Sequence, residues 1–226
     1  MRFSRTQALI GEEALNKLKG ARVAVFGVGG VGGYVIEALA RAGVGAIDII
    51  DNDTVSESNI NRQIIALSST VGNKKTEVIK ARILEINPAC KVNALDMFFL
   101  PETPLDFSEY SYVADAVDTV TAKIEIILRA KQNGVPVISC MGTGNKLQPA
   151  LLTVEDLAKT SICPLARVMR RELKKRGIEH VKTVYSKEEP KRAETGEQTA
   201  VPSSISYVPP VAGLLMASEI INDIIK

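Results

Sequence analysis

The chain has 226 residues, with 28 Lys and Arg against 26 Asp and Glu, and its composition is 46% hydrophobic and 24% charged. This balance is typical of a folded globular protein and excludes an extended disordered chain. Cys90, Cys140 and Cys163 are an odd number of cysteines with wide separations, so neither a disulfide framework nor a Cys-x-x-Cys zinc pair is expected. Because the N-terminal residues are charged and lack an apolar signal-peptide core, we expect a cytoplasmic protein.

Short apolar runs alternate with amphipathic stretches along the first part of the chain, about residues 1–141. We expect helices over about 6–18, 31–41, 74–86 and 121–133, and strands over 23–26, 46–50, 91–95, 111–114 and 135–139. Strands that alternate with helices of this length predict an α/β fold. Its sheet is mostly parallel and Rossmann-like, with helices on both faces.

The second part, about residues 142–226, breaks this alternation and predicts a smaller antiparallel region within the same single domain, 1–226. We expect strands over 150–154 and 181–185, a basic helix over 164–176, a mobile loop over 187–204 and a final helix after Pro210. Residues 198–218 carry no charge, but Pro202, Pro209 and Pro210 interrupt them. A spanning helix needs about 20 mainly apolar residues, so no membrane partner is expected.

The segment over residues 22–53 carries the most specific signal. GVGGVG at 27–32 places Gly27, Gly29 and Gly32 in the G-x-G-x-x-G spacing after an apolar strand. Glycines there permit a tight turn, a close approach of the backbone to a phosphate, and close packing of the next helix, whose N-terminus attracts phosphate. Asp51 ends the second strand, where a carboxylate accepts hydrogen bonds from ribose hydroxyls. This segment therefore predicts a nucleotide site.

Polar residues after Asp51 change the kind of nucleotide that we expect. By itself the glycine motif is most typical of a nicotinamide-dependent dehydrogenase, which would want an apolar pocket here. Instead the chain places Arg62 beside the crevice, and a guanidinium binds phosphate oxygens in pairs. Lys75 supplies a second cation, and the Asp118 carboxylate suits Mg²⁺ that also binds substrate phosphates. Each such residue alone is most often a solvated surface charge, but their joint order favours ATP with Mg²⁺.

The motifs GVGGVG, IIDND, SNINRQ, VGNKKTE and AVDT together resemble the ThiF/MoeB/HesA superfamily of adenylating enzymes. The resemblance implies that Asp51 binds ribose, that Asn59, Arg62 and Lys75 contact the triphosphate, and that Asp118 binds Mg²⁺. It also implies a homodimer in which Arg5 reaches the partner subunit's site. The complete set of expected nucleotide contacts is Gly27, Gly29, Gly30, Gly32, Asp51, Asp53, Asn59, Arg62, Gln63 and Lys75.

The second half of the chain looks like the tRNA threonylcarbamoyladenosine dehydratase branch of this superfamily, in residues 139–178 and in the motifs TVYSKEEP and SISYVPPVAGL. The resemblance implies an ATP-dependent enzyme that adenylates the carboxylate of threonylcarbamoyladenosine in tRNA and cyclises it. Proteins of a sulfur relay are possible partners. The alternative within the family is an activator of a ubiquitin-like sulfur-carrier protein, for which Cys140 or Cys163 would be the reactive cysteine. Missing zinc-binding Cys-x-x-Cys pairs argue against that alternative.

Positive charge is concentrated in one segment. Residues 159–192 hold eleven Lys or Arg against four Glu, a net +7, so the rest of the chain carries −5 of the overall +2. Within this segment Arg167, Arg170, Arg171 and Lys174 recur at helical spacing and predict one basic face. Such a face is usually only solvated, but its concentration here favours contact with the tRNA phosphate backbone.

Overall fold

The computed structural model describes residues 2–191 and 202–226. The middle of the loop expected to be mobile, residues 192–201, lies outside the described residues. A seven-stranded sheet in the order β3-β2-β1-β4-β5-β7-β6 forms the centre of the described chain. Its strands are β1 (Arg22–Phe26), β2 (Ala46–Asp51), β3 (Lys91–Asp96), β4 (Tyr112–Asp115), β5 (Val137–Cys140), β6 (Leu152–Asp156) and β7 (Lys182–Ser186).

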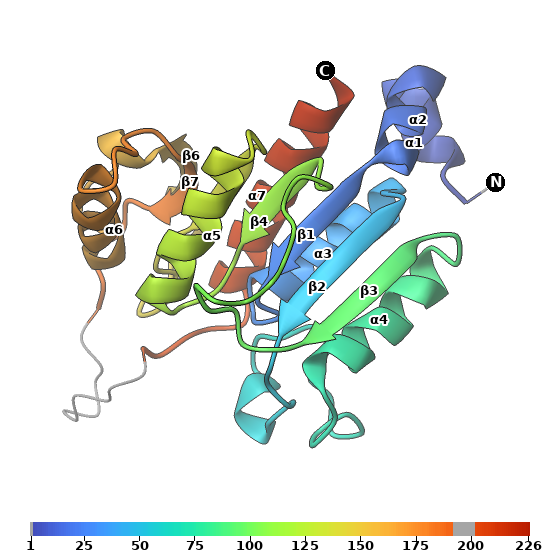
Figure 1. Cartoon of the computed structure of the whole chain (residues 1–226). Helices are drawn as coiled ribbons and strands as arrows, with labels where there is room; N and C mark the ends of the chain where they lie inside the picture. The colour runs from blue at the N-terminus through green and yellow to red at the C-terminus, as the bar shows by residue number, and fades with distance from the viewer. Residues whose placement is uncertain (1, 192–201) are drawn as a thin grey trace.

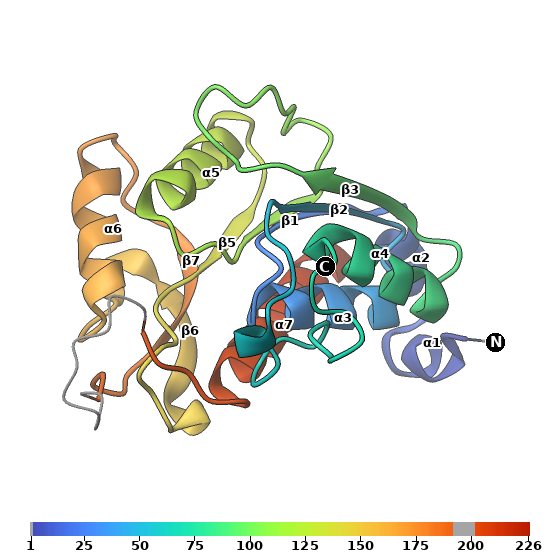
Figure 2. The same ribbon diagram turned by 90° about the horizontal axis from the view of Figure 1, so that it is seen from below.

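All neighbouring strands run parallel except β6 and β7, which pair antiparallel. The helices are α1 (Ser4–Ile10), α2 (Glu12–Gly20), α3 (Gly32–Ala42), α4 (Lys75–Ile86), α5 (Val120–Gln132), α6 (Pro164–Lys174) and α7 (Val208–Ile225), with 3-10 turns at Glu57–Asn59, Pro149–Leu151 and Leu157–Lys159. Helices α3, α4 and α7 cover one face of the sheet, and α5 covers the other with α6 beside it (Figures 1 and 2). The expected Rossmann-like sheet with a small antiparallel C-terminal part is confirmed.

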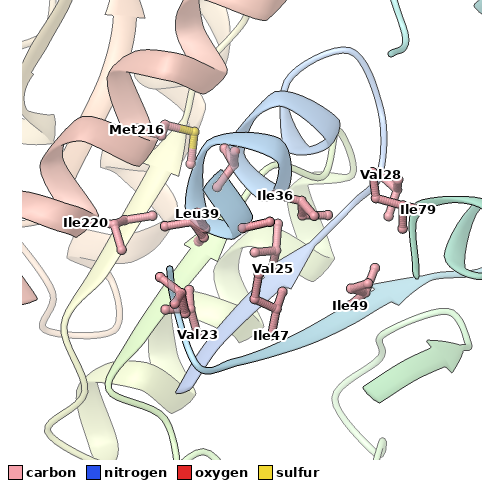
Figure 3. Packing of buried hydrophobic residues seen from close by; sticks show 14 of the residues in the cluster. Val23, Val25, Val28, Ile36, Leu39, Ile47, Ile49, Ile79, Met216 and Ile220 are labelled. Atoms are coloured by element: carbon pink, nitrogen blue, oxygen red, sulfur yellow. The ribbon is translucent and has the colours of Figure 1, made fainter. Parts of the chain in front are cut away.

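Alternate residues of each central strand enter different cores, which explains why these strands are mainly apolar on both faces. Val23 and Val25 of β1 pack with Leu39 and Met216 on the α3 and α7 side (Figure 3). Their neighbours along β1 face the opposite layer, where Phe26 stacks on Phe107 with ring centroids 5.6 Å apart. Burial on both faces therefore fixes this strand in the middle of the fold.

Two helix boundaries differ from expectation. The single helix expected over about 6–18 is two helices, because Gly11 adopts a φ of 86° and ends the first. The last helix begins at Val208 rather than after Pro210, so Pro209 and Pro210 lie inside its first turn. Proline is tolerated there because first-turn N–H groups have no helical partner.

Helix α7 is the one helix of the described chain that is long and apolar enough to cross a membrane. One face of it is buried in the core through Val208, Ala212, Met216 and Ile220. The helix packs against α3, as the core helix of a layered α/β domain does.

The glycine turn packs backbone against backbone. A Cβ on Gly32 would lie 1.8 Å from the carbonyl oxygen of Gly27, and Gly27 itself has a φ of +90°. By contrast, a Cβ on Gly29 would meet no protein atom within 4 Å. The contact between α3 and the end of β1 thus requires a glycine at 32, whereas the fold places no such demand on position 29.

We expect Gly32→Ala to destabilise the fold by about 1–3 kcal/mol or more, because the added methyl forces α3 away from β1. Gly29→Ala, the matched control, should change the free energy of unfolding by less than about 0.5 kcal/mol. Urea denaturation of both variants measures the difference. Equal losses for the two variants would contradict this account of the turn.

Candidate functional site

A cleft of about 870 Å³ opens at the carboxyl ends of β1 and β4. The chain runs from β1 outward to β2 and β3 on one side, and from β4 to β5 on the other, so the strand order reverses here. Crevices at such reversals are the usual ligand sites of open α/β sheets. The cleft is lined by the glycine turn and by the segments that follow β2, β3, β4 and β5.

The glycine turn forms one wall of the cleft through Gly27, Gly29, Gly30 and Val31. Helix α3 begins at Gly32, so its first N–H groups and the positive end of its dipole lie beside this wall. The open space at Gly29 is therefore where a phosphate can approach the backbone.

Asp51 is fixed by two backbone N–H groups at the end of β2. Its carboxylate accepts hydrogen bonds from Val28 N at 2.6 Å and from Asp53 N at 2.8 Å. Burial raises the pKa of Asp51, and these two hydrogen bonds oppose that rise. Because each carboxylate oxygen keeps another lone pair, Asp51 still has acceptor capacity for ribose hydroxyls.

Lys75 begins α4 and reaches the cleft with its side chain buried. Its Nζ lies 2.7 Å from the Asp53 carboxylate, whose side chain is more exposed. Asp53 therefore holds the ammonium in place, and both side chains line the cleft. An incoming phosphate would meet a cation whose position is already set.

Arg62 lies beside the glycine turn, where its Cγ would be 3.2 Å from a Cβ on Gly30. Its guanidinium donates to the Ser58 carbonyl and to Asn61 Oδ1. Asn59 and Gln63, from the same turn, also line the cleft. The Oε1 atom of Gln63 is buried without a hydrogen-bond partner among the described residues. A buried acceptor without a partner is costly, and a ligand donor in the cleft would satisfy it.

Asp118 follows β4 and is exposed in the cleft. The loop that carries it is tied down by Lys123, a fully buried residue of α5, whose Nζ donates to the Val117 carbonyl at 3.0 Å. The same ammonium lies 3.0 Å from the Asp115 carboxylate, which accepts a 2.5 Å hydrogen bond from Ser139. This network was not identified from the sequence, although Lys123 shares a helical face with the buried Ile126, Ile127 and Ala130.

No group of three or more His, Cys, Asp or Glu side chains that could hold a metal ion occurs among the described residues. Asp118 therefore offers one carboxylate rather than a complete protein cage. That arrangement fits Mg²⁺, which is commonly bound by one or two carboxylates together with substrate phosphates and water.

The far end of the cleft is formed by the segment after β5 and by the start of α6. Cys140, Lys146 and Cys163 line it together with Pro164 and Leu165. Both cysteines are buried. Burial raises the pKa of Cys140 to about 12, so its thiol stays protonated at neutral pH.

The remaining predicted site residues lie outside the cleft of their own chain. Arg5 is exposed on α1 and is not among the residues that line the cleft. On α6, Arg167, Arg171 and Lys174 are exposed, but Arg170 is half-buried. The Arg170 guanidinium donates to the Thr160 carbonyl at 2.7 Å and to the Thr160 hydroxyl. The expectation that Arg170 shares a free basic face is therefore wrong: it anchors α6 to the preceding loop.

Residues 3–226 of the chain match the model of the ThiF family. The tRNA threonylcarbamoyladenosine dehydratase of Bacillus subtilis (strain 168) is 44% identical over 240 residues, covering 99% of this chain and 94% of that protein. The crystal structure of E. coli tRNA N6-threonylcarbamoyladenosine dehydratase, TcdA, in complex with AMP superposes with a TM-score of 0.91 at 37% identity, covering 99% and 93% of the two chains. The ATP complex of the E. coli protein gives a TM-score of 0.90 with the same identity and coverage. Matched over nearly its whole length by the family model, the chain belongs to the ThiF family.

Proposed function

We propose that this chain is an ATP-dependent tRNA threonylcarbamoyladenosine dehydratase of the cytoplasm. The observation that carries the proposal is its 44% identity with the Bacillus subtilis dehydratase over 99% of the chain. The cleft supports it, because the glycine turn, Asp51, Arg62, Lys75 and Asp118 all line it and together offer groups that can bind ribose, phosphate and Mg²⁺. The bound AMP and ATP of the related E. coli structures support the same nucleotide.

The proposed reaction has two steps. A carboxylate oxygen of the modified adenosine attacks the α-phosphorus of ATP, and pyrophosphate leaves. An atom of the ureido group in the same modification then attacks the acyl carbon, and AMP leaves with the original carboxylate oxygen. The modification thus loses the elements of water. Because the second attack is intramolecular, proximity supplies much of its rate without a protein nucleophile.

The residues of the cleft take separate roles in this proposal. Asp51 holds the ribose, Asn59 and Gln63 bind polar atoms of the nucleotide, and Arg62 and Lys75 stabilise charge on the phosphates. Gly27, Gly29 and Gly30 keep the backbone open to the phosphates, next to the N-terminus of α3. Asp118 would hold Mg²⁺, which would supply positive charge against the triphosphate.

The alternative, activation of a sulfur-carrier protein, needs a cysteine that forms a thioester or persulfide. A reactive cysteine requires thiolate character, and burial acts against it at Cys140. The proposed dehydration needs no cysteine, which favours it over the alternative. A sulfur-relay protein as a partner is a separate matter and stays a prediction.

Modified tRNA should stimulate ATP–pyrophosphate exchange by this protein, whereas tRNA without threonylcarbamoyladenosine should not, because only the former offers the carboxylate.

Asp118→Ala and Arg62→Ala should each lower turnover about a hundredfold, equivalent to about 3 kcal/mol of transition-state stabilisation. Neither side chain is buried in the core, so thermal unfolding should change little. Equal rates of ATP–pyrophosphate exchange with modified and unmodified tRNA would contradict the proposed function, and so would tight binding of NAD instead of ATP.

We further propose that the protein acts as a homodimer in which Arg5 completes the partner subunit's cleft. Its exposure on α1, away from the cleft of its own chain, is compatible with that role. The proposal rests on the family resemblance for the identity of the residue.

If Arg5 acts across the dimer, Arg5→Ala and Asp118→Ala chains should each be inactive as homodimers. Mixing them should restore activity, because one site of each heterodimer then holds both intact residues. Differently tagged chains allow the heterodimer to be purified and assayed. Verified heterodimers without activity would argue against sharing of Arg5.

We also propose that the exposed basic residues of α6 contact tRNA phosphates. Reversing Arg167, Arg171 and Lys174 to Glu should weaken tRNA binding and flatten its salt dependence, since each phosphate contact releases counterions. ATP affinity should stay the same, because these residues do not line the cleft. The charge-matched control reverses the exposed Lys19, Lys91 and Lys131 on other elements. An equal loss of tRNA affinity in the control would show a general charge effect instead of a site on α6.

A further inference from the structure

Lys146 is a buried ammonium that lines the far end of the cleft. Lys146 is only 3% exposed, and its Nζ donates a hydrogen bond to the main-chain carbonyl of Glu188. An ammonium carries three N–H donors. Among the described residues no carboxylate pairs with Lys146, and no second acceptor is within hydrogen-bond distance of it.

The Glu188 carboxylate, which attracts the Lys146 ammonium electrostatically, is already hydrogen-bonded to main-chain N–H groups. Both oxygens of the Glu188 carboxylate accept from Leu147 N, at 2.9 and 3.0 Å, and one of them accepts from Gln148 N at 2.8 Å. These hydrogen bonds shape the loop that carries Lys146. Glu188 therefore positions the ammonium without forming an ion pair with it.

A second positive feature lies at the same end of the cleft. Helix α6 starts at Pro164, and Cys163, Pro164 and Leu165 line the cleft beside Lys146. The N-terminus of an eleven-residue helix presents unpaired N–H groups and the positive end of its dipole. A buried cation and a helix N-terminus from different elements thus border one space.

Such an arrangement is costly without a ligand. A buried charge is normally paired, because the free-energy cost of removing the charged group from water is offset only by an opposite charge or by hydrogen bonds. Burial lowers the pKa of Lys146, in line with the missing ion pair. An anion in this part of the cleft would supply the missing partner.

We propose that Lys146 binds the carboxylate of the substrate and orients it toward the nucleotide. This inference rests on the proposed function and names the residue that recognises the acyl group. In the first step the ammonium donates to the carboxylate oxygen that does not attack phosphorus. In the second step it donates to the same oxygen, now the acyl carbonyl, where negative charge develops as the ureido atom attacks.

The test compares binding of tRNA with and without threonylcarbamoyladenosine. The wild-type protein should prefer the modified tRNA, and Lys146→Met should lose at least about tenfold of that preference, or about 1.4 kcal/mol. Affinities for ATP and for unmodified tRNA should stay unchanged. Lys187→Met is the matched control, because Lys187 is exposed next to Glu188 and does not line the cleft. If the methionine variant does not fold, Lys146→Gln removes the charge but keeps an N–H donor, one atom shorter than the lysine, for the same comparison.

The pH profile separates recognition from a purely structural role. Since the neutral amine attracts a carboxylate weakly, kcat/KM for modified tRNA should fall as pH rises through the lowered pKa of Lys146. Lys146→Arg should move that limb to higher pH, because a guanidinium stays charged. Titratable or charged groups near Lys146 are the Cys163 thiol, the Glu188 carboxylate and, on the same segment as Glu188, Lys191.

The outcomes distinguish the inference from the proposed function. A wild-type protein that converts modified tRNA, together with a Lys146→Met variant that keeps its preference for the modified form, would overturn the role of Lys146 alone. A wild-type protein that never converts modified tRNA would overturn the proposed function, and with it this inference.

Discussion

Around the glycine turn, backbone atoms of neighbouring segments contact each other directly because no Cβ separates them. The rest of the site depends on this close packing. Gly32 lets α3 contact the end of β1, and a Cβ on Gly213 of α7 would lie 2.3 Å from the Val31 carbonyl oxygen. Helix α3 is therefore held between β1 and α7, with its N-terminus fixed at the cleft. Because the same turn places Val28 N against Asp51, the position of the acidic residue also follows from this packing.

Three lysines around the cleft illustrate how burial separates structural from functional cations. Lys123 and Asp115 are both fully buried, so each charge depends on the other and removing one would leave an uncompensated buried charge. Lys75 is buried but pairs with a half-exposed carboxylate, so a ligand can join the pair. Lys146 is buried without an ion pair among the described residues. A ligand anion would stabilise the last position most, because the Lys146 ammonium forms no ion pair among the described residues and the Glu188 carboxylate attracts it only from a longer distance.

The sequence predicted the central strands well because they are buried on both faces, so their residues are mainly apolar and their ends are marked by turns. Gly27, Gly29 and Asp51 could be found from local sequence motifs and line one cleft, whereas Gly32 of the same motif packs against Gly27 and does not line it. Features that depend on distant residues were missed. Gly11 breaks a helix at a position where a single glycine is often tolerated. The pairing of Arg170 with Thr160, and the burial of Lys123 and Lys146, exist only after the layers have packed.

Helix α6 joins the two parts of the proposed substrate surface. Its N-terminus lines the cleft, whereas Arg167, Arg171 and Lys174 are exposed along the same helix. Ala166, Met169 and Leu173 are buried and hold it against the layer that contains α5. Arg167 and Lys174 are seven residues apart, about 10 Å along a helix, which is a span of a few phosphates on a nucleic-acid strand. Under the proposed function, a rigid α6 thus sets the distance between the phosphate contacts and the cleft, so that backbone binding places the modified nucleoside where Lys146 can receive its carboxylate.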